Sequence, residues 1–445
     1  SRKLPVFANP SPLAVEAAHP PLAVGAVYTP RAKLLGLGSM VFTKSFWLGA
    51  AAAAAWLSGA VSLAGAEPPP AAPAQAPPAK LYADIKINPN GLTPSHVCGK
   101  CHQDIYRAWK NSLHADSFSN PVFQAAFMEA HFQRGESVRE KCLPCHAPVA
   151  ILYRDLQLSS PLSREGINCD FCHSISEVLP DPTGPRHRFE FGRVKQGPLD
   201  GVESPVHKTR YNPLYERSEF CGGCHELKTA EGLKIIETFS EWKASPYPAK
   251  GLHCQSCHMT KIPGKIVPAE VKPTAKEVVS SHDIASGHAL SRREKSLQLT
   301  IAKVERYKNR ITVHVALTNQ GAGHRIPTGL PTKKMVLQVT LQSREGQTRH
   351  VQQKVYQKLL AGADGRIIHN DADLMLGSNL QLISDNRIGP LETRRESFIF
   401  FAPAGEPYEV TAAVYFRHNP KILQTVPINI KMREVRTAIS GGETP

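Results

Sequence analysis

Ten cysteines constrain this 445-residue chain more than any other feature, because they form five Cys-x-x-Cys pairs that are each followed directly by histidine. The five motifs are Cys98/Cys101 with His102, Cys142/Cys145 with His146, Cys169/Cys172 with His173, Cys221/Cys224 with His225, and Cys254/Cys257 with His258. C-x-x-C-H is the attachment sequence of c-type haem: the thiols bond the haem vinyl groups and the histidine is the proximal iron ligand. The sequence therefore predicts five covalently bound haem c groups.

Two other uses of paired cysteines fit this pattern poorly. Zinc sites use Cys pairs, but nothing in their chemistry requires a histidine after every second cysteine. A disulfide framework would need thiols outside the motifs, and none is left over.

The N-terminal residues have the composition of an export signal. Residues 40–66 are interpreted as a signal peptide, with Lys44 before an apolar run and Ala64-Gly65-Ala66 as the cleavage site. Residues 1–39 are interpreted as an upstream extension and residues 67–84 as a Pro/Ala-rich linker. The apolar run is just long enough to span a bilayer, so an uncleaved anchor is the alternative. We expect a periplasmic or extracellular protein.

The five motifs crowd into one part of the chain, and we assign residues 85–290 to a pentahaem cytochrome c domain. About forty residues per haem are too few to wrap each macrocycle separately. The haems are therefore expected to pack against one another as the core of a mostly α-helical and irregular domain, close enough to form a path for electrons.

A different pattern follows, in which apolar and polar residues alternate. Leu297, Leu299 and Ile301 alternate with polar neighbours, and residues 311–317 and 335–341 continue the period of two. Further strands are expected at 396–402 and 408–417. The sequence thus predicts an all-β antiparallel sandwich over residues 291–435, followed by a tail at 436–445. The predicted fold class is multidomain, a haem-cored cytochrome domain plus a C-terminal β-sandwich.

Irons that only carry electrons need a second axial ligand, opposite the motif histidine. Four histidines lie in segments that suit this role. The first ends a predicted helix, the second lies in the loop before the fourth motif, and the third lies in the turn after the last motif. The fourth lies in a Gly-rich loop at 321–331, whose small residues allow close approach to a flat ligand. These four are His114, His207, His282 and His324.

The fifth distal ligand is contested. His131 ends the predicted helical stretch 121–131, and we favour it narrowly over His288. The third alternative is a haem with an open coordination site.

The formal net charge of +15 would suit a nucleic-acid-binding protein. Without residues 1–66 the chain keeps 48 basic and 37 acidic residues, a charge of +11. Five haems add about ten propionate charges of opposite sign. The basic residues therefore balance the cofactors, and no nucleic-acid partner is expected.

The segments around the motifs resemble the multihaem c-type cytochromes, in the branch related to the tetrahaem electron carrier of nitrification. The resemblance covers about residues 90–435 and is carried by segments 97–102, 105–114, 166–173, 218–225 and 254–259, and by a loop at 323–329 that is similar to one in β-domains fused to such cytochromes. It implies that His114 is a distal ligand, and it supports His207, His282 and His324. It also implies haems stacked in parallel and perpendicular pairs. This chain departs from that branch in having five haem motifs and an added sandwich.

These features predict an electron-transfer protein rather than an enzyme, which passes single electrons between redox protein partners along bis-His haems. Bis-His ligation gives lower potentials than Met/His ligation. One alternative is a reductase or oxidase of a small nitrogen or sulfur compound at a haem with an open site. Others are a subunit of an extracellular cytochrome filament, a homo-oligomer, or part of a membrane-associated or cell-surface complex.

Overall fold

The computed structural model describes residues 85–179, 187–272, 277–287, 289–346, 348–420 and 427–442. The predicted upstream extension, signal peptide and Pro/Ala linker lie outside these residues, and so does His288. Within the described ranges, no helix is both long and apolar enough to cross a membrane.

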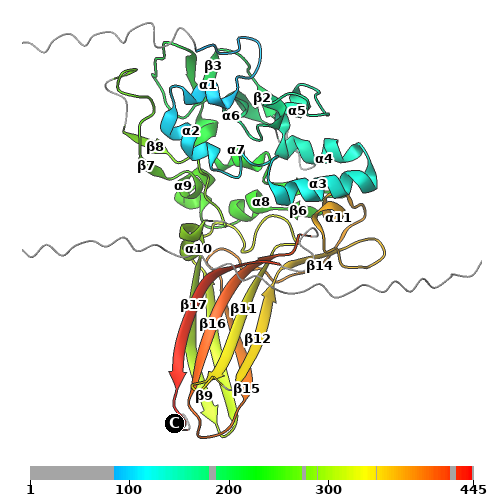
Figure 1. The fold of residues 1–445 in the computed structure, drawn as a ribbon, viewed down its shortest axis with the longest axis vertical. Helices are drawn as coiled ribbons and strands as arrows, with labels where there is room; N and C mark the ends of the chain where they lie inside the picture. The colour runs from blue at the N-terminus through cyan, green and yellow to red at the C-terminus, as the bar shows by residue number, and fades with distance from the viewer. Residues whose placement is uncertain are drawn as a thin grey trace, which may run out of the picture. The chain divides into compact units, whose positions relative to one another are not determined.

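Short helices joined by irregular segments make up the part of the chain that carries the cysteine motifs (Figure 1). The α-helices are α1 (Ser95–Gly99), α2 (Gln103–Lys110), α3 (Pro121–Arg134), α4 (Ser137–His146), α5 (Pro148–Leu152), α6 (Cys169–His173), α7 (Ser218–Gly222), α8 (Thr238–Lys243), α9 (Cys254–His258) and α10 (Leu290–Ser296). Between them lie the 3-10 helices η2 (Leu162–Arg164), η3 (Pro213–Glu216) and η4 (Pro248–Lys250). Helices this short are marginal alone, so tertiary packing must hold them.

Helix α3 begins and ends as its sequence indicates. The Asn120 side chain accepts hydrogen bonds from the backbone N–H groups of Val122 and Phe123, and Pro121 occupies the first turn. Gly135 ends the helix with a φ of 72°, which favours glycine. The helix runs three residues past the predicted end at His131.

Short strand pairs fill the spaces between the helices. The antiparallel pairs are β1 (Ile175–Val178) with β2 (His187–Phe189), β5 (Leu227–Lys228) with β6 (Lys234–Ile236), and β7 (Lys261–Pro263) with β8 (Val278–Ser280). The parallel pair is β3 (Val194–Gly197) with β4 (Lys208–Tyr211).

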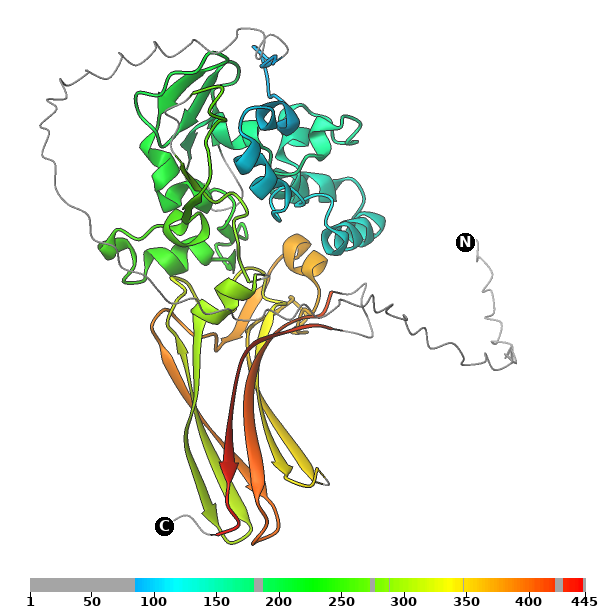
Figure 2. The ribbon, with the colours of Figure 1, turned by 60° about the vertical axis from the view of Figure 1, so that its left-hand side comes forward.

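Two antiparallel sheets form the C-terminal region, and their long strands run side by side (Figures 1 and 2). One sheet has the order β15-β10-β9, built from Thr393–Phe401, Arg310–Asn319 and Leu297–Tyr307. The other has the order β12-β11-β16-β17, built from Arg349–Tyr356, Lys334–Ser343, Tyr408–His418 and Ile428–Ile439. A smaller pair, β13 (Lys358–Ala361) with β14 (Gln381–Asp385), and helix α11 (Asp371–Leu376) complete the region.

The alternation seen in the sequence is the alternation of burial in the sandwich. Ile311, Val313 and Leu317 of β10 are fully buried, and so are Leu337 and Val339 of β11. Successive side chains of a strand point to opposite faces, so each sheet buries one face against the other. The fold class is confirmed: a region of short helices that carries the cysteine motifs is followed by antiparallel sheets. The last strand ends at Ile439, beyond the expected sandwich boundary at residue 435.

Candidate haem-binding site

Each cysteine motif forms about one turn of helix. Helices α6 and α9 are whole motifs, and α4 ends with one. In the first and fourth motifs the histidine N–H donates to the carbonyl of the first cysteine, from His102 to Cys98 and from His225 to Cys221. Residues three and four apart lie on one face of a helix. Both thiols and the histidine of a motif can therefore reach one flat ligand, and all ten thiols are free.

Four of the five motif histidines face another imidazole, and the partner is in each case a predicted distal ligand. The ring centres are 6.1 Å apart for His102 and His207, 6.2 Å for His114 and His225, 6.5 Å for His173 and His282, and 6.4 Å for His258 and His324. The partners come from distant segments, so tertiary folding creates these pairs.

These distances fit an iron atom between the two rings. Two metal–nitrogen bonds of about 2 Å, with about 1 Å from each nitrogen to its ring centre, give about 6 Å. Direct packing of two imidazoles would bring their centres closer.

Backbone carbonyls orient most of these rings. The Nδ1 atoms of His102, His173 and His258 lie 2.8, 2.6 and 2.8 Å from the carbonyl oxygens of residues 266, 196 and 285. On the distal side, His282 and His324 make the same contact with carbonyls of residues 280 and 325. A metal-bound histidine typically donates its second ring N–H in this way. The donation leaves the Nε2 lone pair for a metal.

The surroundings favour neutral imidazoles, the form that binds metal. Burial, together with the charges of neighbouring histidines, lowers the pKa of His114 and His324 to about 4 and that of His225 to about 3. Burial also lowers the pKa of His173 to about 4.

The motif histidine His146 differs from the other four. Its Nδ1 lies 2.7 Å from the Ser117 carbonyl oxygen, like the other oriented rings, but the aromatic ring beside it is Phe123, stacked in parallel at 3.8 Å. His131, the predicted fifth distal ligand, lies beside Phe127, with its Nδ1 3.1 Å from the Gly135 carbonyl oxygen. The structure thus pairs four of the five predicted distal histidines with motif histidines, and it does not bring the fifth, His131, to His146.

The motifs themselves lie side by side. Cysteine side chains of different motifs lie close enough to shift the pKa of one another's thiols: Cys98 with Cys169, Cys221 with Cys254, and Cys145 with Cys224. The first motif therefore adjoins the third, and the fourth adjoins both the second and the fifth.

Cys257 is a predicted haem-attachment residue that the structure does not bring to another motif. It lies in helix α9 with its side chain half-buried and its thiol free. The Cys257 thiol interacts electrostatically with the Tyr247 hydroxyl group. Burial raises the pKa of Tyr247, and Cys257 adds to this increase. The contacts between motifs thus reach the fifth motif through Cys254 and not through Cys257. That Cys257 forms the second thioether bond of this motif stays a prediction, which depends on the C-x-x-C-H spacing.

His187 is not among the predicted functional residues, because the sequence around it is typical of a solvated polar loop, and that interpretation is wrong. Its ring lies 5.7 Å from Phe171 and 5.9 Å from Phe189, centre to centre. Burial lowers its pKa to about 4. A Cβ added to Gly223 would lie only 2.5 Å from the His187 Nε2 atom. The absence of a side chain at Gly223, in the Gly-Gly spacer of the fourth motif, therefore leaves space for the His187 ring.

Replacing Gly223 with alanine is therefore expected to destabilise the protein by about 1–3 kcal/mol, the usual cost of overpacking. Denaturant unfolding of the haem-loaded protein measures the change. Gly287→Ala is the control, since a Cβ there meets no atom of the described chain within 4 Å. Equal stability of the two variants would contradict the close contact.

The loop 321–331, which carries His324, contacts helix α8. The Glu241 carboxylate accepts a hydrogen bond of 3.0 Å from the Arg325 N–H, and the Thr238 and Thr328 hydroxyls are 2.7 Å apart. Arg387 lies against the same helix, with Nη1 2.8 Å from Glu241 and Nη2 2.6 Å from Glu237. These contacts fix the position of His324 opposite His258.

One segment of the chain and its overall fold are similar to known proteins. The family model for cytochrome c554 and c-prime matches residues 97–174. The penta-haem cytochrome c552 from Thermochromatium tepidum shares the fold, with a TM-score of 0.61 and 22% sequence identity over 78% of this chain and 99% of that chain. A putative beta-galactosidase from Bacteroides fragilis matches with a TM-score of 0.16 and 15% identity, over 33% of this chain and 16% of that one. No curated protein matches the chain. The chain therefore has the fold of a penta-haem cytochrome c, and its segment 97–174, which contains the first three haem motifs, is similar to the cytochrome c554 and c-prime family.

Proposed function

We propose that the chain is an exported pentahaem cytochrome that carries electrons between redox protein partners in the periplasm or outside the cell. The observation that carries this proposal is the set of four facing imidazole pairs. A pair on both sides of an iron leaves no coordination position for a substrate, which suits electron transfer rather than catalysis.

The adjacency of the motifs supports a relay. Bound haem supplies one-electron redox chemistry at its iron. The protein's part is to hold neighbouring groups close together: the cysteine contacts join the first motif to the third and make the fourth a junction for the second and fifth. These contacts alone give two separate groups, the first and third motifs and the second, fourth and fifth motifs. Electrostatic interaction of Cys172 with Cys221 and Cys224 supports a connection between the two groups, from the third motif to the fourth.

A second candidate function rests on His146, which faces no imidazole among the described residues. A haem with a free distal position there would suit a reductase or oxidase of a small nitrogen or sulfur compound. This candidate and the electron carrier make different predictions for ligand binding.

The electron-carrier proposal predicts five haems per chain, all low-spin in the oxidised state. Pyridine haemochrome analysis with protein mass spectrometry gives the haem count, and electron paramagnetic resonance gives the spin states. Carbon monoxide added to the reduced protein is expected to leave the spectrum unchanged. A change equivalent to one haem would favour the enzyme, and fewer than five haems would overturn the pentahaem assignment.

A further inference from the structure

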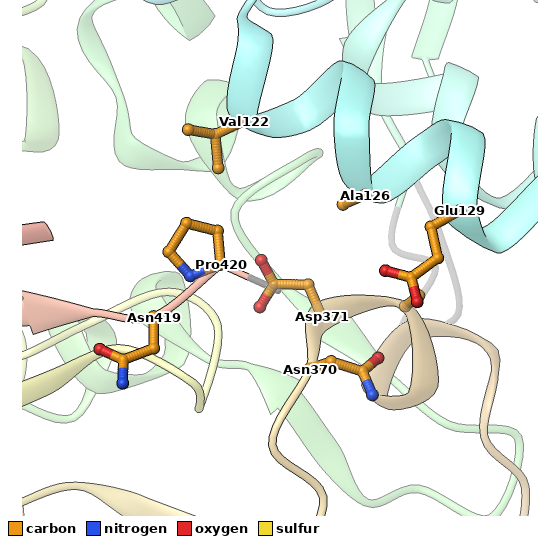
Figure 3. A pocket seen from close by; sticks show the side chains of 8 residues that line it. Val122, Ala126, Glu129, Asn370, Asp371, Asn419 and Pro420 are labelled. Atoms are coloured by element: carbon orange, nitrogen blue, oxygen red, sulfur yellow. The ribbon is translucent and has the colours of Figure 1, made fainter. Parts of the chain in front are cut away.

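The surroundings of His146 include a part of the β-rich region. Helix α11 packs its side chains Ala372 and Leu376 against the apolar cluster of α3 and α4, and α4 ends with His146. Figure 3 shows the start of α11 next to α3, with Asn370 and Asp371 below Ala126 and Glu129 around a small pocket of about 20 Å³. Residues attached to α11 are therefore held close to the second haem motif.

The residue before Lys333, Thr332, forms a hydrogen bond with helix α11 and so holds Lys333 near that helix. The Thr332 hydroxyl donates a hydrogen bond to the Asp371 carboxylate at the first residue of α11. Lys333 follows directly and extends along the loop, where its Nζ lies 3.2 Å from the position that a Cβ on Gly329 would take. The absence of a side chain at Gly329 leaves space for the lysine.

The Lys333 amine has no hydrogen bond or ion pair with any described residue. The nearest carboxylate in electrostatic terms, Asp371, is engaged by Thr332 and lies 3.4 Å from His418 Nε2. Holding a half-buried ammonium without a partner is costly. A neutral amine at the same position has a lone pair, and a metal can accept it.

Electrostatics link Lys333 to the second motif. Burial lowers the pKa of His146, and the charge of Lys333 lowers it further. Lys333 has the same effect on the motif histidine His225, so its amine lies near both the second and the fourth motif. Burial also lowers the pKa of Lys333 itself, which favours the neutral amine. Lys333 thus stands near the one motif histidine that, within the described ranges, lacks a facing imidazole.

We propose that the Lys333 amine is the distal ligand of the haem held by Cys142, Cys145 and His146. This inference rests on the proposed binding of haem at that motif. It completes the ligand set with four His/His pairs and one His/Lys pair, and it makes the segment that joins β10 to β11 supply ligands to two haems.

The test compares Lys333→Ala, Lys333→Arg and the neighbouring control Lys334→Ala in the haem-loaded protein. Loss of the ligand is expected to convert one haem of the oxidised protein from low-spin to high-spin, and to let one haem bind carbon monoxide after reduction. Arginine keeps the charge but cannot give a lone pair at neutral pH, so Lys333→Arg is expected to behave like Lys333→Ala. Lys334→Ala is expected to match the unaltered protein.

Three results would overturn the inference. One is a high-spin haem already present in the unaltered protein. This measurement does not depend on whether a variant folds. The second is a Lys333→Ala protein with all haems low-spin. The third is low-spin ligation kept in Lys333→Arg but lost in Lys333→Ala, because that would make the charge of Lys333 the important property, as in pairing with a haem propionate. A haem count below five in the unaltered protein would instead be a failure of the proposed function.

Discussion

Replacing His114 with alanine is expected to convert one haem from low-spin to high-spin while the chain keeps its full complement of haems. The His114 ring faces His225 at 6.2 Å, and no other imidazole among the described residues lies that close to His225. The predicted thioether bonds come from Cys221 and Cys224, which the substitution leaves in place. The iron should therefore lose one axial ligand and keep its covalent attachment. Electron paramagnetic resonance of the oxidised protein and carbon monoxide binding by the reduced protein measure the change.

His131→Ala is the matched control, because it removes a histidine that the sequence analysis favoured as a ligand. The His131 side chain is 22% exposed and its Nε2 lies 3.6 Å from the Glu136 carboxylate. We expect this variant to keep the spin states and the carbon monoxide response of the unaltered protein. A high-spin haem in His131→Ala, or unchanged spin states in His114→Ala, would show that the facing rings do not identify the ligands.

Replacing Arg387 with methionine is expected to destabilise the protein by about 3–5 kcal/mol, the usual cost of removing one partner from a buried ion pair. The Arg387 side chain is 4% exposed and contacts three carboxylates, those of Glu237, Glu241 and Asp385. Lys358 pairs with Glu237 alone, so the variant leaves Glu241 and Asp385 buried without their partner. The loss also removes the hydrogen bond of 3.3 Å from Arg387 Nη1 to the Pro327 carbonyl.

Denaturant unfolding, followed by circular dichroism and haem absorbance, measures this effect. The control is Arg366→Ala, which breaks the exposed pair with Asp364 and is expected to change stability by less than about 0.5 kcal/mol. Because Arg387 also supports the loop of His324, the variant should bind carbon monoxide at one haem before global unfolding. A loss below about 1 kcal/mol would indicate that the cluster is solvated in the folded protein.

The sequence predicted the features of this chain that depend on local spacing. Haem attachment requires two thiols and an imidazole within one turn, so the motifs are visible in five consecutive residues. The strands that contain Ile311 and Leu337 are visible for a similar reason, since a strand half buried in a sandwich needs an apolar side chain at every second position.

The sequence could not predict the features that depend on tertiary folding. It selected His207 and His282 as ligands but could not assign His207 to His102, or His282 to His173, because no local rule links segments so far apart. It also missed Lys333 and Arg387. A lysine after Pro-Thr and an arginine after Asp-Asn look like ordinary surface residues until folding places Lys333 beside Gly329 and Arg387 against helix α8.

The origin of the facing imidazoles has a consequence for how the protein is made. During synthesis His102, His173 and His258 all precede their partners, whereas His114 precedes His225. The partner of His258 is the latest of all, since His324 belongs to a loop between β10 and β11. With the proposed ligand set, the haem of the last motif gains its second axial ligand only after synthesis has passed residue 324, and a product that stops earlier would carry that motif with one side still open to water.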